Sequence, residues 1–235
     1  MSIAPLAAGG MSASAAFLAW AVRGRSASVF GPSVWHGDRG VRAIALTFDD
    51  GPSESTPELL DVLAQYRAPA MFFQVGAHVD RLPEIARAVV AAGHEIGNHS
   101  YTHPLFFLKS STFIEYELRR AQEAIHARTG VDTRWFRAPY GVRWLGMGRA
   151  QRQLDLTGVM WTTIARDWKL NSNQIFERLA KSAGNGAILC LHDGRGIRRR
   201  PDIRVTVEAV RRLVPALLEQ GYRFETVSRL LCPTN

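Results

Sequence analysis

The order of apolar and polar positions along the chain predicts parallel strands joined by helices. Short apolar and β-branched runs, bounded by turn-forming residues, predict seven strands at residues 43–48, 70–75, 95–98, 133–137, 158–163, 186–192 and 224–226. Between them, apolar residues recur at helical spacing, as at Ile114, Leu118, Ala121 and Ile125 and at Val207, Val210, Leu213, Val214 and Leu217. This alternation predicts an α/β fold in which helices cover a parallel sheet.

Seven such units over this length fit an incomplete (β/α) barrel better than an open sheet, although periodicity does not separate the two. Polar residues fall where predicted strands end: Asp49, Asp50, His99, Arg137, Asp167 and His192. The carboxyl ends of barrel strands converge on one face, so these six residues are expected to share a site. Residues 41–235 are predicted to form the catalytic domain, after an apolar segment and linker at 1–40.

The N-terminal segment is predicted to anchor the protein to a membrane. Residues 3–22 carry no charged side chain, and Phe17, Leu18 and Trp20 make the second half apolar. Arg23 and Arg25 follow this segment instead of preceding it, which favours a catalytic domain on the cytoplasmic side. The alternatives are a cleaved signal, with a secreted or cell-envelope protein, and a peripheral or disordered tail.

Composition narrows the classes of partner. Two cysteines, Cys190 and Cys232, exclude a disulfide framework and a cysteine-based zinc site. The net charge of +8 favours anionic partners such as phosphates, nucleic acid or a membrane surface. No nucleic-acid-binding module is present, so nucleic acid is not expected. The sequence indicates no obligate protein partner.

Two segments have the composition of a metal site. Asp49 and Asp50 lie in the sequence TFDDGP, which alone predicts a turn, but two adjacent acids at a buried strand end repel each other, and a bound cation would explain them. His99 and His103 are four residues apart, so they can bind one metal from one side of a helical turn, whereas a single histidine would be an ordinary polar residue. One carboxylate added to this pair gives a set with open positions that suits hydrolytic metal sites.

Two further segments have both a structural and a catalytic interpretation. Arg137, in RAPYG, either precedes a tight turn or holds a carboxylate as a bidentate partner. His192 ends an apolar strand, where a lone histidine is usually structural. With a nearby carboxylate it would stay protonated near neutral pH and could donate a proton to a leaving group.

These segments and Asp167-Trp168, taken in order, resemble the motif set of the polysaccharide deacetylase family, carbohydrate esterase family four, over residues 43–231. The resemblance implies a distorted barrel with fewer than eight strands and metal-dependent removal of N-acetyl or other short N-acyl groups from a polysaccharide, an oligosaccharide or a lipid-linked glycan. It implies a general base at Asp49, metal ligands at Asp50, His99 and His103, a residue that orients the base at Arg137, a partner of the acid at Asp167 and the general acid at His192. The metal is expected to be zinc, with cobalt, nickel or manganese as alternatives.

The resemblance also implies two substrate contacts and shows two departures. The backbone N–H of Tyr140 would help to bind the oxyanion, and Trp168 would help to wall the acyl pocket. Ile164 stands where the family often has an acidic residue, which would alter the charge around the site. Cys190 replaces a larger aliphatic residue and would widen the acyl pocket.

A basic run begins three residues after His192 and contains Arg195, Arg198, Arg199 and Arg200. A loop that leaves this strand end emerges on the catalytic face, where arginines could bind the phosphate of an anionic substrate or a lipid headgroup. The simpler interpretation is a solvated surface loop.

Two other functions remain as alternatives. A related amidase would cleave a C–N bond in a non-sugar substrate such as a cyclic ureide, but the Asp49–Asp50 pair and Arg137 favour the sugar deacylase. A non-catalytic glycan-binding protein would be expected to lack a ligand or the acid, and all of them are present.

Overall fold

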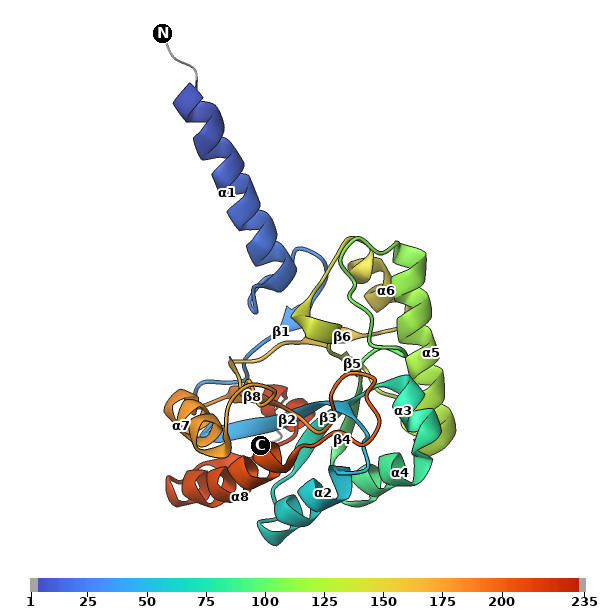
Figure 1. Ribbon diagram of the computed structural model, residues 1–235, viewed down its shortest axis with the longest axis vertical. Coiled ribbons are helices and arrows are strands. Elements are labelled where there is room, and N and C mark those ends of the chain that lie inside the picture. The colour runs from blue at the N-terminus through green and yellow to red at the C-terminus, as the bar shows by residue number, and fades with distance from the viewer. Residues whose placement is uncertain (1–3, 233–235) are drawn as a thin grey trace.

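The structure is a computed structural model that describes residues 4–232, with side chains described from residue 14 onward. One parallel sheet curls into a partial barrel with helices on its outer side (Figure 1). The described strands are β1 (Ser33–Val34), β2 (Ala43–Gly51), β3 (Ala70–Gln74), β4 (Glu95–Asn98), β5 (Trp135–Phe136), β6 (Thr157–Val159), β7 (Thr163–Ile164), β8 (Ala187–His192) and β9 (Arg223–Phe224). Their order is β1-β6-β5-β4-β3-β2-β8-β7, and β9 also pairs with β2. The predicted incomplete barrel is confirmed.

Helices follow most strands, as the apolar spacing predicts. They are α1 (Ala4–Arg23), α2 (Thr56–Gln65), α3 (Gly76–Arg81), α4 (Pro83–Ala91), α5 (Ser111–Thr129), α6 (Met147–Gln153), α7 (Ser172–Ser182), α8 (Arg204–Glu219) and α9 (Val227–Leu231), with a short 3₁₀ turn, η1, at Pro139–Gly141. Ser110 caps the start of α5, and Gly130, with φ 72°, ends it. The apolar residues expected to face the sheet from α5 and α8 are buried.

The sheet differs from the prediction at its two edges. The predicted strand at 158–163 is two strands, because β6 pairs with β1 and β5 while β7 pairs with β8. β6 and β7 lie near opposite edges of the sheet order, yet only residues 160–162 separate them, so the sheet curls until its edges approach each other. The predicted linker also contributes β1, which is too short to give a period-two signal. The described residues therefore form nine strands, several of them only two residues long, where the sequence predicts about seven.

Strand β2 forms the centre of the fold. All nine of its residues are buried, and it pairs with both β3 and β8. Its register sets Asp49 opposite His192 of β8, and the pairing with β3 shifts between Asp49 and Gly51. Such an irregularity re-aims a side chain, here that of Asp50, at the carboxyl end of the sheet.

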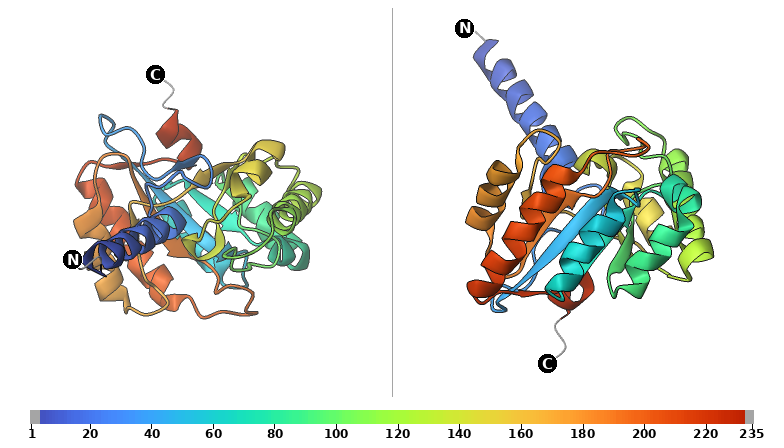
Figure 2. Two further views of the ribbon diagram at one scale, coloured as in Figure 1. Left: turned by 90° about the horizontal axis from the view of Figure 1, so that it is seen from above. Right: turned by 60° about the horizontal axis from the view of Figure 1, so that its bottom comes forward.

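Helix α1 projects away from the domain, as Figure 1 and the right view of Figure 2 show. Of its residues 14–23, whose side chains are described, Ala21 and Val22 in the last turn are buried. Residues 1–13 of the predicted anchor lie outside the part whose side chains are described. Among the described residues, no helix combines the length and hydrophobicity needed to cross a bilayer. The boundary between segment and domain at residue 40 stays a prediction.

Candidate active site

Arg137 joins the ends of three strands. Its fully buried guanidinium donates from Nη1 to Oδ1 of Asp49 at 2.7 Å and to the hydroxyl of Thr47 at 2.8 Å. Nε and Nη2 donate to the backbone carbonyls of Val159 and Met160 at 2.9 and 3.1 Å. With every nitrogen engaged, Arg137 fixes the orientation of the Asp49 carboxylate.

Asp50, His99 and His103 present their ligand atoms to one point. Oδ1 of Asp50 lies 3.3 Å from Nε2 of His99 and 3.0 Å from Nε2 of His103. Nδ1 of His99 lies 2.8 Å from the carbonyl oxygen of Arg137, so Nδ1 carries the hydrogen and Nε2 is free to bind a metal. A tetrahedral site with bonds of about 2.0–2.1 Å sets its ligands roughly 3.3 Å apart, so these residues fit a divalent metal ion.

The metal-binding candidates are held in place by their surroundings. The second oxygen of Asp50 accepts the backbone N–H of Gly196 at 2.8 Å. Burial alone would raise the pKa of Asp50, but the contacts of its carboxylate with the imidazoles of His103 and His99 outweigh this effect and hold the pKa well below its usual value. Asp50 and His103 both have positive φ, at 75° and 55°. Such strain in residues other than glycine concentrates at functional sites.

His192 and Asp167 form a buried pair beside these residues. Nδ1 of His192 lies 2.7 Å from Oδ1 of Asp167, whose second oxygen accepts the backbone N–H of His192 and the hydroxyl of Thr206. Burial lowers the pKa of His192, but the charge and hydrogen bond of Asp167 overcome this effect and raise the pKa to about 9. His192 is therefore protonated at neutral pH and can serve as a proton donor.

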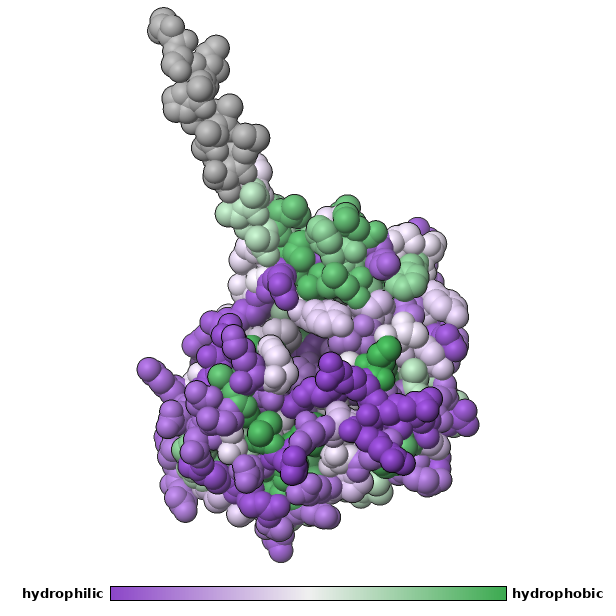
Figure 3. All heavy atoms as spheres, in the orientation of Figure 1, coloured by the Kyte–Doolittle hydropathy of each residue, from purple (hydrophilic) through white to green (hydrophobic). Residues whose placement is uncertain are grey.

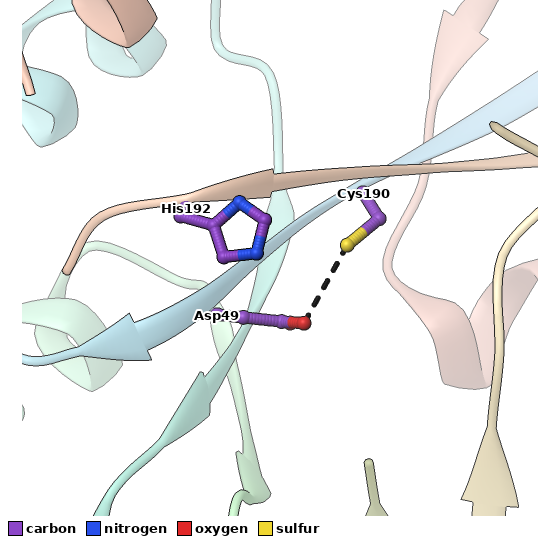
Figure 4. Close-up of side chains that lie close together, drawn as sticks. All are labelled: Asp49, Cys190 and His192. Atoms are coloured by element: carbon purple, nitrogen blue, oxygen red, sulfur yellow. Dashed lines mark hydrogen bonds between the residues drawn. The ribbon is translucent and has the colours of Figure 1, made fainter. Parts of the chain in front are cut away.

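Cys190 lies beside the base and the acid candidates. Its thiol is buried 3.5 Å from Oδ2 of Asp49, and Figure 4 shows Asp49, Cys190 and His192 gathered from β2 and β8. These three residues could also offer ligand atoms to a metal. Burial raises the pKa of the Cys190 thiol well above its usual value, so the thiol stays protonated and is a poor ligand. Asp49 is moreover engaged by Arg137, so Asp50, His99 and His103 form the group better suited to bind a metal.

Tyr140 and Trp168 lie at the edge of this site. The ring of Tyr140 packs 4.7 Å from that of His103, and its backbone has φ 59° in the turn after β5. The indole of Trp168 meets the imidazole of His192 edge-on at 5.1 Å. Both aromatic side chains are more than half exposed, which leaves them accessible to a substrate.

The supporting roles of two residues, Glu117 and Arg195, were not predicted from the sequence. Glu117, on the buried face of α5, accepts the backbone N–H groups of Tyr101 and Thr102, and so holds the turn between the two histidine ligand candidates. The sequence signal for this role is the presence of a charged residue within the apolar stripe of the helix. Arg195, predicted to face an anion with its neighbours, instead turns inward and donates to the Asp167 carbonyl at 3.0 Å. Of the four arginines in that run, Arg198, Arg199 and Arg200 are exposed.

Comparison with known proteins agrees with this arrangement. The family model described as polysaccharide deacetylase matches residues 36–159. The chitooligosaccharide deacetylase of Bradyrhizobium sp. (strain ANU 289) is 36% identical over 200 residues, which cover 81% of this chain and 91% of that one. The chain belongs to the polysaccharide deacetylase family. As a member, it is an enzyme of the class that hydrolyses N-acetyl groups of amino sugars.

Solved structures of this polysaccharide deacetylase family share the fold. The Bc1960 peptidoglycan N-acetylglucosamine deacetylase superposes with a TM-score of 0.80 at 25% identity, over 86% of this chain and 94% of that one. BA3943, a family four pseudoenzyme from Bacillus anthracis, superposes with a TM-score of 0.77 at 28% identity, over 84% of this chain and 68% of that one. Because a pseudoenzyme shares this fold, the fold does not establish the roles of individual residues, and these roles are inferred from the geometry of the site.

Proposed function

We propose that this protein is a divalent-metal-dependent hydrolase that removes N-acetyl groups, or other short N-acyl groups, from an amino sugar in a glycan. The observation that carries the proposal is one buried site that combines a metal-ligand triad, a carboxylate fixed by Arg137 and a protonated His192. The substrates named for the relatives, chitooligosaccharide and peptidoglycan N-acetylglucosamine, support this substrate class.

In the proposed reaction, the metal ligands, the base, the oxyanion contact and the acid have separate roles. A divalent ion held by Asp50, His99 and His103 would polarise the acyl carbonyl and make a water more acidic. Asp49 removes a proton from the attacking water, while Arg137 keeps the carboxylate in place. The backbone N–H of Tyr140 stabilises the oxyanion. His192 then donates its proton to the nitrogen of the leaving amine, and the products are a short acid and a free amino sugar.

The metal is proposed to be zinc. Two imidazoles and one carboxylate suit zinc, although cobalt, nickel and manganese accept the same ligands. Metal analysis of the purified protein, followed by reconstitution with each ion, tests this choice. A protein that is purified with another ion and is inactive with zinc would rule zinc out.

The substrate is proposed to carry a negative charge, such as the phosphate of a lipid-linked glycan. Arg198, Arg199 and Arg200 are exposed on the loop that leaves the strand bearing His192. Changing all three to Gln should lower kcat/KM selectively on a phosphate-bearing substrate, and the difference should shrink at high salt. An equal effect on a neutral oligosaccharide would leave this loop as ordinary surface.

The protein is proposed to associate with a membrane, with its catalytic domain on the cytoplasmic side because Arg23 and Arg25 follow the apolar segment. Protease access from outside intact cells would contradict this orientation.

The proposed chemistry is tested by a substrate comparison. The metal-loaded protein should release free amine from N-acetylated chitooligosaccharides and should leave a cyclic ureide intact. Ring opening of the ureide without deacetylation would establish the amidase alternative.

A further inference from the structure

Three chain segments meet where α1 joins the domain. The backbone N–H of Arg143 donates to the carbonyl of Val22 at 3.0 Å, and its guanidinium donates to the carbonyls of Gly24 and Ala27. The ring of Trp144 contacts that of Phe107 at 4.5 Å. These contacts join the end of α1, the loop after His103 and the loop after η1 into one surface.

This joined surface is apolar and exposed. Figure 3 shows hydrophobic residues gathered at the foot of α1 and across the adjoining part of the domain. The most exposed are Leu108 and Leu145, at 71% and 62%. The others are Phe17, Leu18, Trp20, Val29, Leu105 and Phe107. We refer to these eight residues as the apolar collar.

The chain segments that carry the apolar collar contain basic residues and no acidic ones. Residues 1–37, 104–114 and 138–154, which contain or adjoin the collar, include no Asp or Glu although the chain has 21 such residues. Arg23, Arg25 and Lys109 lie in these segments and are exposed. An apolar surface built from segments that carry cations and no acids matches the headgroup region of an anionic bilayer.

The apolar collar adjoins the candidate active site. Leu105 is two residues beyond the ligand candidate His103, and Tyr140 packs on His103 from the loop that continues to Leu145. Both loops leave carboxyl ends of strands, β4 and β5, on the catalytic face. A surface that the collar contacts would therefore lie beside the substrate entrance.

We propose that the apolar collar docks on the surface of an anionic lipid bilayer, so that the active site opens beside the headgroups. This inference deepens the proposed membrane association, since it adds a second contact on the catalytic domain and does not require a helix that spans the bilayer. Arg23, Arg25 and Lys109 would contact the headgroups while Leu108 and Leu145 enter the interface.

A fluorescent label on the catalytic domain tests docking directly. An environment-sensitive dye is attached to Leu108→Cys in the full chain carrying Cys232→Ser, because the remaining Cys190 is buried. Vesicles of phosphatidylglycerol and phosphatidylcholine should shift the emission of this label to the blue, and pure phosphatidylcholine should shift it less. The matched control is Leu218→Cys on α8, whose label should not respond.

A binding variant gives the second measurement. Leu108→Ser combined with Leu145→Ser should weaken co-sedimentation with the anionic vesicles about tenfold, as expected for two apolar side chains lost from the interface. The control, Tyr116→Ser combined with Leu218→Ser, changes two exposed apolar residues elsewhere and should bind normally. Neither measurement uses catalysis, so both can succeed if the proposed deacetylation fails.

Three outcomes would overturn the inference. Co-sedimentation without a response at residue 108 would show that α1 binds alone. Absence of binding to either vesicle would remove the lipid surface as the partner. A dimer in solution that the Leu108 and Leu145 substitutions dissociate would show that the apolar collar is covered by a second copy of the chain.

Discussion

Arg137 donates a 2.7 Å hydrogen bond to Oδ1 of Asp49, and the other carboxylate oxygen, Oδ2, lies 3.5 Å from the buried thiol of Cys190. Arg137 directly follows β5 and Asp49 lies in β2, and these strands are not neighbours in the sheet, so the pairing of the two residues depends on its curvature. The pairing separates the two acids of the TFDDGP segment. Asp49 is fixed by the guanidinium of Arg137, while Asp50 faces His99 and His103.

This separation predicts different effects for the two acids. Asp49→Asn keeps the shape of the side chain and removes its ability to accept a proton, so turnover should fall at least ~100-fold, as expected for loss of a general base. Metal content should stay near that of the unmodified protein, because Asp49 is not among the proposed ligands. Near-normal turnover would contradict the role of Asp49, and loss of metal would place this residue among the ligands.

The metal triad predicts a selective loss of binding. His99→Ala removes one of three ligands and should abolish stoichiometric zinc binding in a calorimetric titration. His126→Ala is the matched control, because His126 is exposed and pairs with Asp132 away from the site. Equal zinc affinity in the two variants would show that the metal binds elsewhere.

The pair formed by His192 and Asp167 predicts the alkaline limit of activity. The pKa of His192 is raised to about 9, so the proton donor is present at neutral pH and is lost as the pH rises through about 9. The rate of deacetylation should therefore fall on the alkaline side. Asp167→Asn removes the anion that supports the protonated imidazole, so the fall should move to lower pH in a kcat profile. An unchanged alkaline limit in this variant would assign that limit to another group.

Arg195 predicts an effect that depends on the leaving group. Nη2 of Arg195 donates to the carbonyl of Asp167, and Nη1 lies 3.8 Å from its carboxylate, so Arg195 positions the residue that pairs with His192. Arg195→Ala should slow release of an amine, which must be protonated, and should barely affect an acetate ester of nitrophenol, which leaves unprotonated. Arg195→Lys should recover part of the loss. An equal loss on both substrates would indicate general damage to the fold.

Much of the barrel could be predicted from the sequence because its central strands are long and apolar. β2 and β8 contain long runs of consecutive apolar residues, which predict buried strands, and the acids and histidines lie at the ends of these strands. The edges could not be predicted in this way. Ser33–Val34 and Thr163–Ile164 are two-residue strands whose pairing depends on how the sheet curls, and no local pattern records that.

The same division applies to the candidate site. His99 and His103 are close in sequence, so their spacing indicates that they bind one metal ion. Arg195 lies beside three arginines that are exposed, and nothing local distinguishes it from them. Its inward orientation follows from the position of Asp167, which is remote in sequence and is brought near by the pairing of β7 with β8.

The most direct test of a metal-dependent deacetylase is acetate release measured against metal occupancy. Metal-free protein is titrated with zinc while acetate and free amine from an N-acetylated chitooligosaccharide are measured together. The account predicts equal amounts of the two products, no release without metal, and a rate that rises until one ion is bound per chain. A full rate in the metal-free protein, or no release from protein with the site at Asp50, His99 and His103 loaded, would contradict the central claim.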